Sequence, residues 1–218
     1  YWCETFDELY NMELCQSGSY ITKTMSVQPI KDNQTSSLYY DALCVNSMDF
    51  SNLGFSSYME YSLTVKNNNK PLFFSINHNN IKDTTKMLSM IYIKLHHTNI
   101  KGIEFNISCP DIIGTSQIGY DIKQLRVFLN MISESKLWNI PRDSLAIGLK
   151  IPPYFEKIQI EHIADLIKEY PRMDFITFIN GIGSGLVIDV EKECSKQNHL
   201  YGCLDDSLIK PIGLANTK

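Results

Sequence analysis

One cysteine of this chain stands where a proton-transfer group would be useful. Cys109 lies in the run Asn-Ile-Ser-Cys-Pro at residues 106–110, directly after the apolar run Gly-Ile-Glu-Phe at residues 102–105. The apolar run predicts a buried strand, and the carboxyl end of such a strand is where parallel β/α folds carry out chemistry. Because the following proline fixes the backbone, the sulfur can be aimed rigidly at a substrate. The alternative is a buried cysteine that serves only packing, but the flanking Asn106 and Ser108 favour the chemical role.

A lysine that ends an apolar run could also take part in chemistry. Lys150 ends the apolar run Ala-Ile-Gly-Leu-Lys at residues 146–150, and a lysine there is costly to bury unless it faces an anionic or electron-rich group. Asn-Ser-Met at residues 46–48 by itself suits an ordinary turn. Lys150 therefore is the residue that indicates an anionic partner.

Several other kinds of site find no support. His96 and His97 are adjacent and cannot share one face of a helix, so we expect no metal site. The six cysteines lack CxxC spacing, which fits free thiols in a reducing compartment. A net charge of −4 gives no basic surface for nucleic acid, and no apolar run has transmembrane length. We expect a cytoplasmic protein that binds neither nucleic acid nor membrane.

Apolar runs alternate with longer amphipathic stretches, which predicts βαβ units around a parallel sheet. Strands are expected at residues 20–24, 72–76, 103–107, 145–150 and 175–179, and helices at residues 55–66, 81–97, 121–135 and 159–169. A first helix follows Thr5 with a capping-box pattern and should end near residues 17–18, and a last helix should begin after Pro211. Residues 31–37 and 67–69 are expected to be polar connections.

Further runs match, in order, the sequence pattern of one known family. They are Ser-Tyr-Ile-Thr-Lys at residues 19–23, Asn-Ser-Met at 46–48, Asn-Leu-Gly-Phe at 52–55, Pro-Leu-Phe-Phe-Ser-Ile at 71–76, Gly-Thr-Ser-Gln-Ile-Gly-Tyr-Asp at 114–121, Gly-Leu-Lys-Ile-Pro-Pro-Tyr-Phe at 148–155, Asn-Gly-Ile-Gly-Ser-Gly-Leu at 180–186, Ile-Lys-Pro at 209–211 and Leu-Ala-Asn at 214–216. Together with residues 106–110 they resemble the dihydroorotate dehydrogenase family, specifically its cytosolic class that uses fumarate as oxidant. The resemblance covers nearly the whole chain.

The resemblance implies an α/β fold of the (β/α)₈ TIM-barrel type. Residues 1–218 would form a single incomplete domain, a partial barrel of about five parallel strands that lacks the first and last units. A complete barrel typically needs ~250 residues, and aligned with the family the chain leaves out strands one, seven and eight. We therefore expect a fragment of a longer protein or an incomplete gene model. The alternative is that something else covers the open sheet edges.

The resemblance also implies an activity and its residues. The family oxidises dihydroorotate to orotate in de novo pyrimidine biosynthesis, with FMN as cofactor, fumarate as oxidant and a homodimer as the usual state. A base takes the proton from C5 of dihydroorotate, and Cys109 matches that base. The positions that match substrate contacts are Lys23, Asn46, Met48, Phe50, Asn106, Asp111 and Asn180. The positions that match FMN contacts are Lys23, Thr24, Asn106, Lys150 and Ile179.

Four departures from the family pattern add negative charge. Asp49 replaces a glycine of the substrate loop, and Asp111 replaces a substrate-binding asparagine. Residues 201–206 match a glycine-rich loop of the family near the cofactor, and Asp205 and Asp206 replace two of its glycines. Orotate and FMN are both anions, so each carboxylate within ~4–6 Å would oppose their binding by roughly 3–4 kcal/mol at an effective dielectric near 20.

Two smaller departures remove groups that contact ligands. Gly181 replaces a serine, and Thr115 replaces a lysine. The departures leave two alternatives to the family's activity: a catalytically inactive paralogue with a binding or regulatory role, and a flavoenzyme for a neutral pyrimidine-like substrate. Flavin bound on purification would separate the flavoenzymes from the inactive paralogue, and orotate binding would separate the two flavoenzymes.

Overall fold

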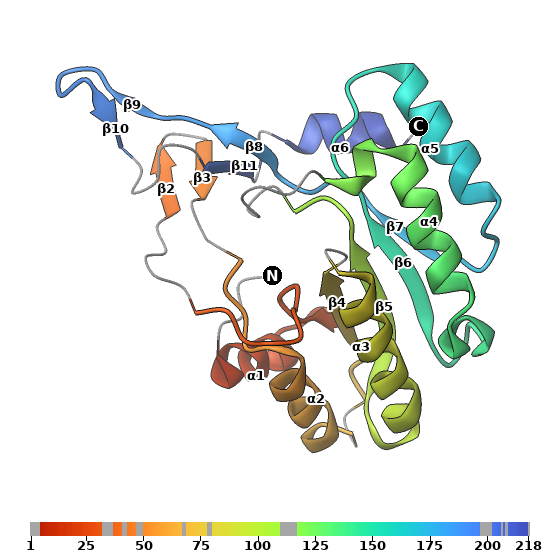
Figure 1. Ribbon diagram of the computed structural model, residues 1–218. Coiled ribbons are helices and arrows are strands. Elements are labelled where there is room, and N and C mark those ends of the chain that lie inside the picture. Colours follow the sequence, from red (N-terminus) through yellow and green to blue (C-terminus); the bar gives the residue numbers. More distant parts are fainter. Residues whose placement is uncertain are drawn as a thin grey trace.

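A sheet of five parallel strands in the order β1-β4-β5-β6-β7 is the centre of the computed structural model (Figure 1). The structure describes residues 5–31, 37–40, 43–46, 50–66, 69–77, 80–109, 117–196, 202–205, 207 and 209–217. The parallel strands are β1 (Tyr20–Ile21), β4 (Leu72–Asn77), β5 (Ile100–Asn106), β6 (Ala146–Lys150) and β7 (Phe175–Thr177). Their spatial order follows the chain, as in a β/α barrel, so the expected partial barrel is confirmed.

Of the six helices among the described residues, the first precedes β1 in the sequence, the last follows the final strand, and the other four lie between strands. The helices are α1 (Phe6–Leu14), α2 (Phe55–Thr64), α3 (Ile81–Lys94), α4 (Ile122–Ser133), α5 (Lys157–Lys168) and α6 (Lys210–Asn216), with 3₁₀ turns at Leu95–His97, Ile118–Tyr120 and Lys136–Asn139. Figure 1 shows α3, α4 and α5 along the outside of the strands. Phe105 of β5 is buried and meets the ring of Phe128 on α4 edge to face at 5.6 Å, which ties the sheet to the helix layer.

The inner face of the sheet is filled at its amino end by two phenylalanine rings. The Phe73 ring lies over Gly102, where a Cβ would stand 2.1 Å from its Cδ1, and the Phe175 ring lies over Gly148, where a Cβ would stand 2.4 Å from its Cε2. The two rings meet edge to face at 5.8 Å. Glycine is therefore required at both positions, because any side chain would push a ring out of the sheet's inner face.

The first helix begins as predicted and ends earlier. Thr5 and Glu8 form the capping box, in which each side chain accepts a hydrogen bond from the other residue's backbone N–H. The helix ends at Leu14 rather than near residues 17–18. The ammonium of Lys70 donates to the carbonyls of Met12 and Cys15 at 2.7 and 2.8 Å, so a residue distant in the sequence satisfies the last carbonyls of this helix.

A second, antiparallel sheet was not predicted. It has the order β2-β3-β11-β8 and consists of β2 (Ser37–Tyr40), β3 (Leu43–Asn46), β8 (Ile182–Gly185) and β11 (Gly202–Asp205). A short hairpin of β9 (Ile188–Asp189) and β10 (Cys194–Ser195) extends from it. Figure 1 shows this sheet beyond the carboxyl ends of the parallel strands. The expectation of a loop at residues 201–206 is therefore wrong for 202–205, which pair with β3 and β8.

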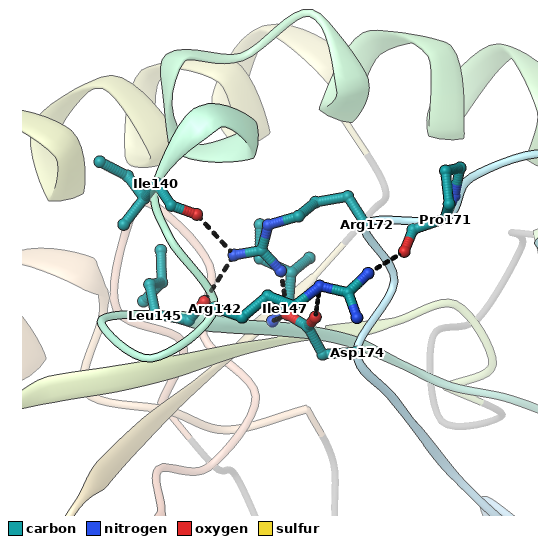
Figure 2. Close-up of polar contacts among 7 residues, drawn as sticks. All are labelled: Ile140, Arg142, Leu145, Ile147, Pro171, Arg172 and Asp174. Atoms are coloured by element: carbon teal, nitrogen blue, oxygen red, sulfur yellow. Dashed lines mark hydrogen bonds and ion pairs between the residues drawn. The ribbon is translucent and has the colours of Figure 1, made fainter.

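Asp174 joins β6 and β7 at their amino ends (Figure 2). Its Oδ2 accepts hydrogen bonds from the backbone N of Ile147 at 2.8 Å and from the guanidinium of Arg172, and its own N–H donates to the Ile147 carbonyl at 2.7 Å. Arg172 Nη2 also donates to the carbonyls of Ile140 and Leu145 at 2.9 and 2.6 Å. Because this cluster lies at the ends of the strands opposite to Cys109, we assign it to stability rather than to the site.

Candidate functional site

The described residues with predicted roles gather where the parallel strands end. Asn106 and Lys150 are the last residues of β5 and β6, and Asn180 follows β7 closely. Lys23 and Thr24 follow β1. All five side chains are buried, with exposed fractions of 9% or less. The sequence-distant motifs therefore meet at the carboxyl edge of the sheet, the edge that carries the active site in β/α barrels.

The amide of Asn106 connects three segments. Its Nδ2 donates to Thr24 Oγ1 at 3.0 Å, while its Oδ1 accepts from the backbone N of Ser108 at 3.2 Å and from Asn180 Nδ2 at 3.1 Å. Asn180 Nδ2 also donates to the carbonyl of Ser108 at 2.7 Å. Both backbone groups of Ser108 are thus held by side-chain amides, which fixes the residue directly before Cys109.

Cys109 follows a firmly anchored strand end. Ile107 N donates to the carbonyl of Lys150 at 3.2 Å, and Gly119 N donates to the carbonyl of Ile107 at 3.0 Å. Ser108 Oγ donates to the same Lys150 carbonyl at 3.3 Å. The Cys109 side chain is 9% exposed. In its thiolate form, this nearly buried side chain on a fixed backbone could accept a proton from a group that is brought to it, as a bound substrate would be.

Two buried ammonium groups share the carboxyl edge. Lys23 Nζ donates to Ser51 Oγ at 2.8 Å, and Phe50, the partly exposed residue before Ser51, lies in the same segment. Lys150 lies in register with Asn106 on the neighbouring strand. Together with the nearby amides and hydroxyls, these groups form a set of donors that suits a ligand rich in acceptor oxygens.

Some predicted positions are described only in part. Asn46 ends β3, and its backbone pairs with Ser37 and Cys203, which places it in the antiparallel sheet. Ile179 is buried in the segment after β7. Two predicted site residues, Met48 and Asp111, lie outside the described residues. The same holds for three other departures from the family pattern: Asp49, Thr115 and Asp206.

The carboxylate of Asp205 lies beside the backbone of Gly181. Gly181 N donates to Asn180 Oδ1 at 3.0 Å, so this backbone borders the site. A Cβ at Gly181 would stand 2.1 Å from Cys203 Sγ and 2.4 Å from Asp205 Oδ1. The strand β11 therefore brings a carboxylate to the edge of the site, and a side chain at position 181 would have to displace the side chains of Cys203 and Asp205.

Three polar residues on the inner face are not singled out by the sequence motifs. Glu104 is 1% exposed, and its carboxylate accepts hydrogen bonds from Ser75 Oγ at 3.3 Å and from Thr177 Oγ1 at 2.6 Å. Ser75 Oγ in turn lies 2.9 Å from Thr24 Oγ1. In the sequence, Glu104 is the residue that could have indicated this buried polar group, because a carboxylate inside an apolar strand is rare unless it is hydrogen-bonded or paired.

Two features are absent from the described ranges. Among those residues, no group of three or more histidine, cysteine, aspartate or glutamate side chains is arranged to hold a metal ion. No helix within the same ranges is both long enough and apolar enough to cross a membrane.

Comparison with known proteins places the chain in a family. A family model described as dihydroorotate dehydrogenase matches residues 2–218. A fumarate-type dihydroorotate dehydrogenase of Trypanosoma cruzi is 30% identical over 218 residues, which cover 98% of this chain and 67% of that protein. Dihydroorotate dehydrogenase A (fumarate) of Lactococcus lactis is 31% identical over 224 residues, covering 99% of this chain and 68% of that protein.

A solved structure agrees with these matches at the level of the fold. The crystal structure of ligand-free type DHODH from Eimeria tenella aligns with a TM-score of 0.66 at 15% sequence identity, covering 88% of this chain and 59% of that one. The chain thus spans about two thirds of the length of its curated relatives. Since the family model matches all but the first residue, the chain belongs to the dihydroorotate dehydrogenase family.

Proposed function

We propose that this protein, in its full natural form, oxidises dihydroorotate to orotate in de novo pyrimidine biosynthesis. FMN would be the cofactor and fumarate the final oxidant, as the resemblance to the fumarate-linked class implies. The observation that carries the proposal is the buried polar cluster at the carboxyl edge, in which Asn106 and Asn180 hold the backbone directly before Cys109. A homodimer in the cytoplasm is the state that the same resemblance implies.

In this proposal Cys109 Sγ takes the proton from C5 of dihydroorotate. The base must meet C5 in a fixed geometry, and the hydrogen bonds that hold Ser108 supply a fixed backbone for it. The amides of Asn106 and Asn180 would bind the pyrimidine ring, and the Lys23 ammonium would bind the substrate carboxylate. The backbone of residues 46–50, together with Met48 and Asp111, would complete the substrate contacts.

The donor set also fits the ring system of FMN. The pyrimidine edge of that ring is rich in acceptors, and the buried Lys150, Lys23 and Asn106 offer cationic and amide donors on one edge of the sheet. Thr24 and the backbone of Ile179 would add contacts. When bound, FMN would accept the hydride from C6 of the substrate. The Lys150 ammonium would favour negative charge on the ring, because a fixed cation in a buried site stabilises developing charge strongly.

A second candidate function is favoured by Asp205. Its carboxylate lies against Gly181, beside Asn180, where the family's ligands are anionic. A negative charge at that place opposes orotate and FMN. It would be tolerated in a flavoenzyme for a neutral pyrimidine-like substrate, or in a non-catalytic paralogue that binds or regulates.

The visible absorption spectrum of the protein distinguishes these functions. The protein is made from its full natural reading frame, supplied with FMN and purified. The proposed function predicts a flavin spectrum that bleaches anaerobically with dihydroorotate and returns with fumarate. A flavin spectrum that does not bleach with dihydroorotate would support the neutral-substrate enzyme, and a folded protein that takes up no FMN would support the paralogue.

Two cysteine variants test the role of the base. Cys109→Ser should keep bound FMN and lose most of the bleaching rate at neutral pH, because a serine hydroxyl is a far weaker base than a thiolate. The matched control is Cys15→Ser, since Cys15 is an exposed free thiol after α1. Equal bleaching rates in both variants would remove Cys109 from the mechanism.

A further inference from the structure

A buried chain of hydrogen bonds leads from the centre of the sheet to the site. It begins at Glu104 in the middle of β5, passes through Ser75 of β4 to Thr24 after β1, and ends at the amide of Asn106. All four residues are buried, with Ser75 fully enclosed. Four residues from three strand segments therefore form one continuous polar path inside an apolar fold.

The carboxylate gives this chain a direction. Ser75 has one hydroxyl hydrogen, which it donates to Glu104 Oε1 at 3.3 Å. Ser75 must then accept from Thr24, whose own hydrogen is thereby used in their 2.9 Å contact. The oxygen of Thr24 is left to accept from Asn106 Nδ2 at 3.0 Å. Each donor thus points toward Glu104, and the Asn106 amide must present its nitrogen to Thr24.

The orientation of that amide matters for the residue before Cys109. With its nitrogen toward Thr24, Asn106 presents its oxygen to the Ser108 N–H at 3.2 Å and to Asn180 Nδ2 at 3.1 Å. A flipped amide would set a donor against both of those donors, and a buried unmade hydrogen bond is expensive. The hydrogen bonds from Glu104 to Thr24 therefore favour one orientation of the Asn106 amide. The contacts of Ser108 and Asn180 with its oxygen favour the same orientation.

We propose that Glu104 is a positioning residue, which acts through Ser75 and Thr24 to fix the Asn106 amide and with it the backbone before Cys109. Its effect is transmitted by the direction of the hydrogen bonds through Ser75 and Thr24. The inference depends on the proposed function only where it concerns turnover. The effect of Glu104 on the Asn106 amide is expected in the protein without any ligand.

The hydroxyl groups of Ser75 and Thr177, which both donate to the Glu104 carboxylate, provide a matched comparison. Ser75→Ala removes one hydrogen bond to the carboxylate and cuts the chain. Thr177→Val removes the other hydrogen bond to the same carboxylate, at 2.6 Å, and leaves the chain to Asn106 intact. Since Ser75 also contacts Thr24 directly, this pair tests whether the path through Ser75 controls Asn106, and only Ser75→Ala should disturb that amide. Whether the path depends on the carboxylate is tested by Glu104→Met.

The test is amide hydrogen exchange by NMR on the full-length protein without added flavin. In Ser75→Ala, exchange at the Asn106 side-chain amide and the Ser108 backbone N–H should rise about tenfold, as expected for one lost buried hydrogen bond. In Thr177→Val both rates should stay within about twofold of the parent protein. Equal changes in the two variants, or no change in either, overturn the proposal.

A second variant tests the carboxylate itself and also covers the case in which Ser75→Ala does not fold. Glu104→Met removes both acceptor oxygens with an apolar side chain of similar length. The same rise in exchange at Asn106 and Ser108 is expected, and unchanged exchange overturns the proposal.

Turnover then separates this inference from the proposed function. Where the protein bleaches with dihydroorotate, Glu104→Met and Ser75→Ala should lower kcat more than Thr177→Val does. Exchange effects without any turnover would uphold the role of Glu104 and refute the dehydrogenase activity. Turnover with identical exchange in all variants would uphold the dehydrogenase activity and overturn the role of Glu104.

Discussion

Replacing Asp174 by alanine should destabilise the fold strongly, because this carboxylate serves several donors at the amino ends of β6 and β7. The change leaves the backbone N–H of Ile147 without the acceptor that it reaches at 2.8 Å. It also removes the carboxylate partner of Arg172. The side chains of Arg172 and Asp174 are only 11% and 13% exposed, so water cannot fully replace the lost contacts.

The size of the effect follows from these contacts. A buried donor left unsatisfied costs about 1–3 kcal/mol, and breaking a buried ion pair from one side costs about 3–5 kcal/mol. Arg172 keeps its hydrogen bonds to the carbonyls of Ile140 and Leu145, which lowers the cost. Arg142 Nε lies 3.1 Å from Asp174 as an ion pair, but its side chain is 60% exposed and adds little. We therefore expect a loss of about 3 kcal/mol in the free energy of unfolding.

Urea denaturation followed by tryptophan fluorescence measures this loss. Asp174→Asn keeps an acceptor oxygen for Ile147 and should lose about half as much. Glu169→Gln is the matched control, because the Arg126–Glu169 pair has the same chemistry with both side chains exposed, and its loss should be much smaller. If Asp174→Ala and Glu169→Gln shift the midpoint equally at equal slope, burial does not decide the strength of these pairs and the reasoning fails.

Asp205→Asn removes a negative charge at the edge of the site without changing its volume, and should tighten orotate binding about fivefold in calorimetry; unchanged binding would show that this charge lies too far from the ligand. Hydrogen bonds from Ser17 lower the pKa of the exposed Cys15 thiol to about 7, so its alkylation should be half-maximal near pH 7. Ser17→Ala should raise that pKa and slow alkylation at pH 7 several-fold, as read by peptide mass spectrometry, and an unshifted pH profile would contradict this cause. Asn216 Nδ2 donates to the Tyr154 carbonyl at 2.9 Å, so Asn216→Asp sets a carboxylate against that carbonyl. This variant should be cleaved faster by proteases within residues 207–217, and equal cleavage rates in variant and parent would count against the contact.

The parallel sheet could be predicted from the sequence because its strands are continuous apolar runs. Ile103 and Phe105 of β5 are buried against the helices, and the run around them has no other plausible structure. The antiparallel sheet could not be predicted, since its strands have four residues each. The pairing of β3 with β11 joins segments near opposite ends of the chain, so no local pattern specifies it.

The site was predictable to the extent that its residues follow apolar runs. Cys109, Asn106 and Lys150 all stand at the ends of such runs, and the structure places them at one edge of the sheet. The hydrogen-bond chain through Ser75 and Glu104 depends on which strands are neighbours and on their register, in which these two residues are paired. That register is a tertiary property, and motif spacing along one chain does not contain it.

Two departures from the family pattern turn out to be one packing arrangement. In the sequence, Gly181 in place of serine and Asp205 in place of glycine are separate losses. In the structure, a Cβ at Gly181 would stand 2.4 Å from the Asp205 carboxylate and 2.1 Å from Cys203 Sγ, so β11 occupies the space that a serine would need. A serine at position 181 would therefore have to displace the side chains of Cys203 and Asp205. The charge, by contrast, can be removed by Asp205→Asn with almost no change in volume, so this variant tests the effect of the charge on ligand binding without disturbing the packing.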